Sequence, residues 1–113
     1  MRNYDVEEIK AELRSRGVDV ATSGGNCPLQ IEGRVDDIYH FYFRARGSRW
    51  TLTIGLRQTY GGNGNWFYWE PYGIEYEAGW MSEERGLWLL LSAVMFFRDE
   101  QFGPPKNNCN IVA

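Results

Sequence analysis

The sequence YHFYFRARGSRWTLTI, residues 39–54, contains two runs in which apolar and polar side chains alternate, joined at Gly47 and Ser48. Alternation with a period of two is typical of β-strands, whose successive side chains point to opposite faces of a sheet. A two-residue loop that begins with glycine fits a type II′ turn, because the first loop position needs a positive φ. We therefore predict an antiparallel hairpin in which Arg46 lies opposite Arg49.

This hairpin register divides the side chains between two faces of the predicted sheet. The first face is apolar and is expected to join the core: Phe41, Phe43, Ala45, Trp50, Leu52 and Ile54. The second face is polar and cationic: His40, Tyr42, Arg44, Arg46, Arg49, Thr51 and Thr53. Tyrosine and arginine are residues that interfaces favour, so we expect the cationic face to meet a partner.

A preceding strand is predicted over residues 29–35, where apolar and polar residues again alternate. Its apolar side chains share the core face of the hairpin only if the connecting loop holds an odd number of residues, so we predict a three-residue turn at 36–38. In this register Gly33 lies opposite Phe41, where the missing side chain makes room for a ring. Glu32 then contributes a carboxylate to the cationic face.

Two helices are expected to flank these strands. Asp5, with Glu8 three residues later, marks the start of a helix over about residues 5–16. A second helix is predicted over about residues 82–101, with a serine cap and carboxylates in its first turn. Residues 21–26, ATSGGN, are expected to form a turn-rich linker.

A further strand is predicted at residues 66–69, WFYW, shortly before Pro71. Proline cannot donate to a ladder, so this strand should end there or lie at a sheet edge. A period of two sends Trp66 to one side and Trp69 to the other, so one of the two leaves the core side. If the strand pairs with the second strand of the hairpin, the ring that leaves the core joins the cationic face.

The second helix is apolar on nearly every side, since Ser92 is the only polar residue among residues 87–97. A helix that merely covers a sheet needs only one apolar stripe. Either this helix is buried centrally between the sheet and the first helix, or its outer side is a subunit interface. We favour a homodimer, because so short a chain offers little protein to cover the helix twice. The expected interface residues are Trp88, Leu89, Ser92 and Phe96.

Length and composition predict a single α+β domain in residues 1–105, followed by a flexible tail at residues 106–113. The domain should consist of an N-terminal helix, a three- or four-stranded antiparallel meander and a C-terminal apolar helix packed on one face of the sheet. The net charge of −3 argues against a dedicated, strongly basic nucleic-acid binder.

The cysteines and the absence of targeting patterns bear on the compartment. Cys27 and Cys109 form no CxxC pair, and the start of the chain shows no secretory signal. We expect reduced thiols in a cytoplasmic protein, with a disulfide between the two as the alternative. The apolar run of the second helix is too short to span a membrane, which takes about 20 residues.

Two segments resemble a known group of proteins. EGRVDDIYHFYFRARGSRWTLTIG, residues 32–55, and AGWMSEERGLW, residues 78–88, together about a third of the chain, are similar to small uncharacterised bacterial proteins of phage and other mobile genetic elements, including integron gene cassettes. The resemblance implies the same strand, turn and helix scaffold and a mobile-element origin. It implies no activity for any residue.

No enzyme template fits the sequence. His40 is the only histidine, no phosphate-binding glycine motif is present, and no residue activates either cysteine as a nucleophile. We therefore predict no cofactor and no metal. The candidate binding residues are Glu32, His40, Tyr42, Arg44, Arg46, Arg49, Arg57, Trp66 and Trp69.

Three functions from different classes remain open. The favoured one is a non-catalytic, dimeric interaction protein that presents the arginine and aromatic face to a protein partner with an acidic surface. The second is a single-stranded nucleic-acid or nucleotide binder that stacks bases on Tyr42 and a tryptophan. The third is a small enzyme or ligand carrier with a cleft near His40, Tyr42 and Glu32, beneath the loop at residues 61–65.

Overall fold

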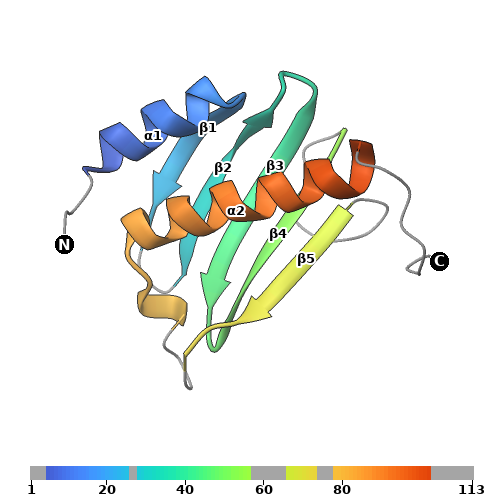
Figure 1. The fold of residues 1–113 in the computed structure, drawn as a ribbon. Helices are drawn as coiled ribbons and strands as arrows, with labels where there is room; N and C mark the ends of the chain where they lie inside the picture. The colour runs from blue at the N-terminus through green and yellow to red at the C-terminus, as the bar shows by residue number, and fades with distance from the viewer. Residues whose placement is uncertain (1–4, 26–27, 57–65, 74–77, 103–113) are drawn as a thin grey trace.

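The computed structural model describes residues 5–25, 28–56, 66–73 and 78–102, without the side chains of residues 101 and 102. Two helices lie on one face of an antiparallel sheet (Figure 1). The elements are α1 (Val6–Ser15), β1 (Val18–Gly24), β2 (Leu29–Val35), β3 (Tyr39–Arg46), β4 (Arg49–Gly55), β5 (Trp66–Pro71), the 3₁₀ turn η1 (Ala78–Trp80) and α2 (Glu83–Phe102). The strand order is β1-β2-β3-β4-β5, so the predicted α+β meander is confirmed, with five strands instead of three or four.

The additional strand is β1, which includes residues that we expected to form a linker. β1 pairs with β2 from Val18 to Gly24, and the register shifts between Val20 and Thr22. This shift interrupts the alternation of period two, and small or polar residues fill the second half of the strand. The expectation of a linker was therefore wrong, because main-chain pairing to β2 forms this strand without an apolar pattern.

Both predicted registers are confirmed. Arg46 lies opposite Arg49 across the β3–β4 hairpin, and Gly47 has a φ of 66°, as the first loop position requires. Gly33 lies opposite Phe41 across β2 and β3, as the three-residue turn predicts. These registers place the apolar face of the hairpin against the helices.

The core lies between the helices and this apolar face. α1 begins with the capping box of Asp5 and Glu8 and contributes buried residues to the core. α2 contributes the largest share. Leu87, Leu90 and Val94 are fully buried. The α1 and α2 side chains in the core are Ile9, Leu13, Leu87, Leu90, Leu91, Ala93, Val94 and Phe97.

Arg98 joins α2 to the far ends of α1 and β2. Its Nη2 donates to the carbonyl oxygen of Arg16 at 2.6 Å, at the end of α1. The same nitrogen lies 2.6 Å from Asp36 Oδ1, in the turn after β2. One guanidinium therefore satisfies an orphan helix carbonyl and a carboxylate, which fixes three elements relative to one another.

Gly33 supplies a test of the sheet packing. A Cβ at this position would lie 1.9 Å from the carbonyl oxygen of Asp19 and 2.9 Å from Phe41 Cε2. Because a backbone oxygen cannot rotate away, we expect Gly33→Ala to lower the free energy of unfolding by at least about 2 kcal/mol, near the upper range for single substitutions. Urea denaturation measures the change. Arg34→Ala, at the exposed neighbouring position, should cost about 0.5 kcal/mol or less; equal effects would contradict the packing.

Candidate functional site

The face of the sheet opposite the helices carries the candidate site. On this face Arg44, Thr51 and Trp69 form one row across β3, β4 and β5, and Arg46 lies opposite Arg49 in the next row. Phe67 also belongs to this face, because it lies opposite Thr53. We call Arg44, Arg46, Arg49, Phe67 and Trp69 the arginine–aromatic patch.

The two rings of the patch are exposed, with 44% of Phe67 and 48% of Trp69 accessible to solvent. The guanidinium carbon of Arg49 lies 5.3 Å from the centre of the Trp69 ring, within the range of a cation–π contact. Arg46 is exposed on the other strand of the hairpin. Trp69 therefore has its ring held in place by a cation while much of its surface remains available.

The charge of the patch is not neutralised within the described part of the chain. No described carboxylate forms a salt bridge with Arg44, Arg46 or Arg49. The Nε of Arg44 is also buried without a hydrogen-bond partner among the described residues. Like charges opposite each other in a ladder repel, so an anion bound here would stabilise the hairpin tip.

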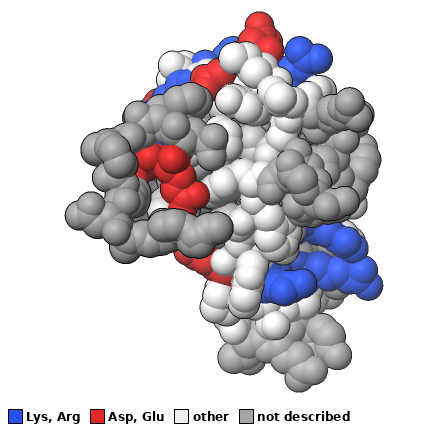
Figure 2. Space-filling view, turned by 90° about the vertical axis from the view of Figure 1, so that its right-hand side faces the viewer, with Lys and Arg blue, Asp and Glu red and all other residues white. Residues whose placement is uncertain are grey.

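Part of the surface charge is also grouped by sign. Figure 2 views the molecule from the side of β5 and shows a group of basic side chains at lower right, acidic side chains at the left, an uncharged band between these two groups, and basic and acidic side chains together at the top. A group of basic side chains gives its part of the surface a positive potential, which steers partners of opposite charge.

Glu32, His40 and Tyr42 lie on the same helix-free face, with Glu32 opposite Tyr42, as the register predicted. Tyr42 is only 8% exposed, and its hydroxyl donates to Gln30 Oε1 at 2.9 Å. It is therefore too deeply buried to stack on a base. His40 lies opposite Arg34 and Gly55 on this face and is partly buried.

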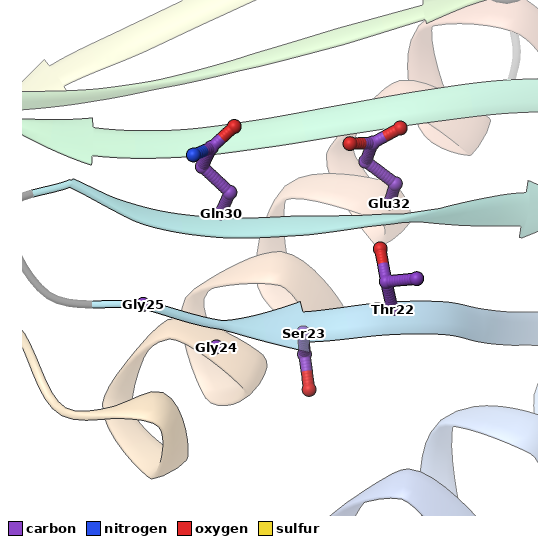
Figure 3. Close-up of a pocket in the computed structure, with 6 residues that line it drawn as sticks. All are labelled: Thr22, Ser23, Gly24, Gly25, Gln30 and Glu32. Carbon is purple, nitrogen blue, oxygen red and sulfur yellow. The ribbon is translucent and has the colours of Figure 1, made fainter.

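Glu32 lines a shallow depression at the β1–β2 end of this face, with a volume of about 340 Å³. Gln30, Thr22 and Glu32 point to the same side of the sheet, whereas Ser23 points away (Figure 3). The hydroxyl of Ser23 donates to Glu83 instead. Neither His40 nor Tyr42 lines this depression. The predicted cleft beneath the loop at residues 61–65 involves residues outside the described ranges and stays a prediction.

Trp66 lies on the helix-covered face of the sheet. Trp69 is therefore the tryptophan of β5 that leaves the core side. Its ring meets Phe97 edge-on, with centroids 5.2 Å apart, and its Nε1 donates to Glu100 Oε1 at 2.7 Å. Trp66 is therefore not part of the patch. Sequence reasoning placed Trp69 among the candidates but not Phe67, although the strand period puts the two on the same side.

Some predicted features lie outside the described residues. These are Arg57, the loop at residues 61–65, Cys27, Cys109 and the tail at residues 106–113.

The predicted interface residues of α2 are only partly accessible. Trp88 and Leu89 are half-buried, while Ser92 is exposed and Phe96 is 39% exposed. The sheet and α1 cover much of the apolar surface of α2. Such burial within one chain was the alternative to a dimer. The homodimer through α2 stays a prediction.

A groove separates α2 from β5. It has a volume of about 230 Å³ and is lined by Trp50, Tyr68, Glu70, Leu89, Ser92, Ala93 and Phe96. Within it, Tyr68 Oη donates to Glu70 Oε2 at 2.5 Å. This hydrogen bond, burial, and the charges of Glu70 and Glu100 raise the pKa of Tyr68 to about 12.

Comparisons with protein-family models, curated proteins and solved structures find no significant match to this chain. Among the described residues, no group of three His, Cys, Asp or Glu side chains is placed to hold a metal ion. No helix in the described ranges is long and apolar enough to cross a membrane. The mobile-element resemblance stays a prediction.

The Tyr68–Glu70 bond predicts a pH dependence of stability. The pKa of Tyr68 rises from 10.0 to about 12 in the folded state. Between pH 10 and 12 the Tyr68 hydroxyl therefore keeps its proton in the native state and loses it in the unfolded chain. The resulting stabilisation should be complete below about pH 10 and should disappear as the pH rises towards 12. Urea denaturation across this range should show a shallower decline for Tyr68→Phe than for the natural sequence.

Tyr72→Phe is the matched control for this experiment, because it removes a nearby hydroxyl and leaves the Tyr68–Glu70 bond in place. Its decline should follow that of the natural sequence. If Tyr68→Phe shows the same alkaline decline as this control, the bond does not hold the proton on Tyr68.

Proposed function

We propose that this protein is a non-catalytic binding protein whose arginine–aromatic patch recognises an acidic surface on a protein partner. The observation that carries the proposal is the Arg49 guanidinium over the exposed Trp69 ring, beside Arg44 and Arg46, which have no described carboxylate to pair with. Tryptophan and arginine are the residues that most often dominate binding energy at protein interfaces.

The arrangement of the patch suits an acidic protein surface. Guanidinium groups bind carboxylates through two parallel hydrogen bonds, so neighbouring arginines can each hold one carboxylate of a partner. Trp69 and Phe67 offer apolar area beside these charges. A partner with Asp or Glu next to apolar side chains would contact both parts.

Two observations favour a protein over single-stranded nucleic acid as the partner. Stacking platforms for nucleic acid combine exposed rings with a continuous basic groove. Tyr42, one of the rings expected to stack, is 8% exposed. The net charge of −3 also adds repulsion for a polyanion beyond the immediate patch.

The test is a titration of isotope-labelled protein, followed by NMR, with a short peptide rich in Asp, Glu and Leu. We expect the indole signal of Trp69 and the amide signals of residues 44–51 to shift. The double variant Arg46→Glu/Arg49→Glu should weaken binding at least about 10-fold, since truncation of interface arginines commonly costs more than 1 kcal/mol.

Arg85→Glu/Arg14→Glu is the matched control, because it makes the same charge change at exposed arginines on the helices and should leave peptide binding largely intact. Arg46→Ala should change the free energy of unfolding by no more than about 0.5 kcal/mol, which separates binding from folding. Arginine-dependent binding of oligo(dT) without binding of the peptide would reject the protein partner in favour of nucleic acid. Peptide binding that persists in Arg46→Glu/Arg49→Glu would exclude the patch.

A further inference from the structure

The two edge strands of the sheet differ in how they are protected. Exposed edges pair readily with other chains, and proteins usually block them with bulges, charges or covering elements. β1 has such protection, because its register shifts between Val20 and Thr22 and α1 packs against it. β5 pairs with β4 without a shift over its whole length, and no described strand lies on its outer side.

The outward main-chain groups of β5 can be identified from one hydrogen bond. The N–H of Tyr72 donates to the carbonyl of Ser48 at 2.8 Å. Because the direction of main-chain groups alternates along an antiparallel strand, the even-numbered residues of β5 bond to β4. Phe67, Trp69 and Pro71 therefore point their main-chain groups away from the sheet.

Pro71 fits this arrangement. Proline has no N–H, and at this outward position an N–H would not bond to β4, so no hydrogen bond of the sheet is lost. The N–H and C=O groups of Phe67 and Trp69 form a ready pair of donors and acceptors at the edge. Residues 66–69 include no charged side chain that would deter pairing.

Exposed apolar side chains flank this edge on both faces of the sheet. Phe67 and Trp69 are 44% and 48% exposed on the helix-free face. On the helix side, Phe96 is 39% exposed and its ring centre lies 5.2 Å from that of Tyr68. The uncharged band in Figure 2, which faces the viewer from the side of β5, agrees with this arrangement.

We infer that β5 pairs antiparallel with β5 of a second copy of this chain, around a two-fold axis at Tyr68. In this register Phe67 of each copy lies opposite Trp69 of the other, so the outward groups of these residues form four main-chain hydrogen bonds. The same pairing places a Phe and a Trp ring side by side twice on the helix-free face, and cross-strand aromatic pairs stabilise sheets.

The sequence of β5 favours a second copy over an unrelated strand. When a second β5 runs antiparallel to the first, the N–H and C=O groups of Phe67 in one copy meet the C=O and N–H groups of Trp69 in the other. The two rings then lie on the same face. An isologous pair also closes, because each copy covers the β5 edge of the other, on whose outer side no described strand lies. The product is a continuous sheet of two five-stranded halves, with all helices on one face and both arginine–aromatic patches on the other.

The inference does not rest on the proposed function, and it differs from a dimer through α2. Size-exclusion chromatography with light scattering, over a range of concentrations, should show a species of twice 13.2 kDa. Hydrogen exchange should show protection of the Phe67 and Trp69 amides that weakens as the dimer is diluted. A monomer at every concentration, or free exchange of both amides within the dimer, would overturn the inference.

Phe67→Lys places a charge on the edge strand and should give a folded monomer at concentrations where the natural sequence is dimeric. Ile38→Lys makes the same change at an apolar residue that is 58% exposed in the β2–β3 turn, and should remain dimeric. Circular dichroism verifies that each variant is folded. A dimer that survives Phe67→Lys but dissociates in Ser92→Arg would locate the interface on α2 and reject the pairing of β5.

Discussion

The close packing of α2 across the sheet is the contact on which the rest of the structure depends. At Gly86 the helix approaches β2 so closely that a Cβ would lie 2.5 Å from Leu29 Cδ2. This approach brings Leu87, Leu90 and Val94 to full burial, and burial of each such side chain contributes about 1.5–3 kcal/mol. Because both helices occupy the same face, the opposite face and the edge at β5 remain for recognition.

Two groups of described arginines have different surroundings. Arg16 and Arg98 pair with Glu12 and Asp36, at N–O distances of 2.7 and 2.6 Å, and hold the ends of helices and turns. The arginines of the patch have no such described partner, and Arg49 contacts a ring instead. The first group contributes to the fold, and the second group is available for an anionic partner.

β5 connects the two surfaces on which our proposals depend. Its side chains at Phe67 and Trp69 belong to the patch, while the main-chain groups of the same residues point to the edge. Pairing of two β5 strands would leave the arginines uncovered and would place two patches on one continuous face. A bivalent surface of this kind gains affinity for a partner with two acidic sites through effective concentration.

How much of the structure could be predicted depended on the range of the interactions involved. The registers at Arg46 and Gly33 followed from the period of two and from loop parity, which are local properties of the chain. β1 was missed because its register shift and small residues erase the period, and its pairing comes from β2. The burial of Tyr42 and the assignment of Phe67 to the patch also depended on neighbouring strands.

The sequence by itself determined the hairpin, the helix caps and the segregation of arginines to one side of β3 and β4, because side-chain alternation and turn chemistry act over a few residues. Only the tertiary structure decided that α2 buries much of its apolar surface within one chain, that Trp66 faces the helices, and that β5 is the last described strand at one edge of the sheet. These outcomes depend on contacts between segments far apart in the chain, whose geometry no local pattern encodes.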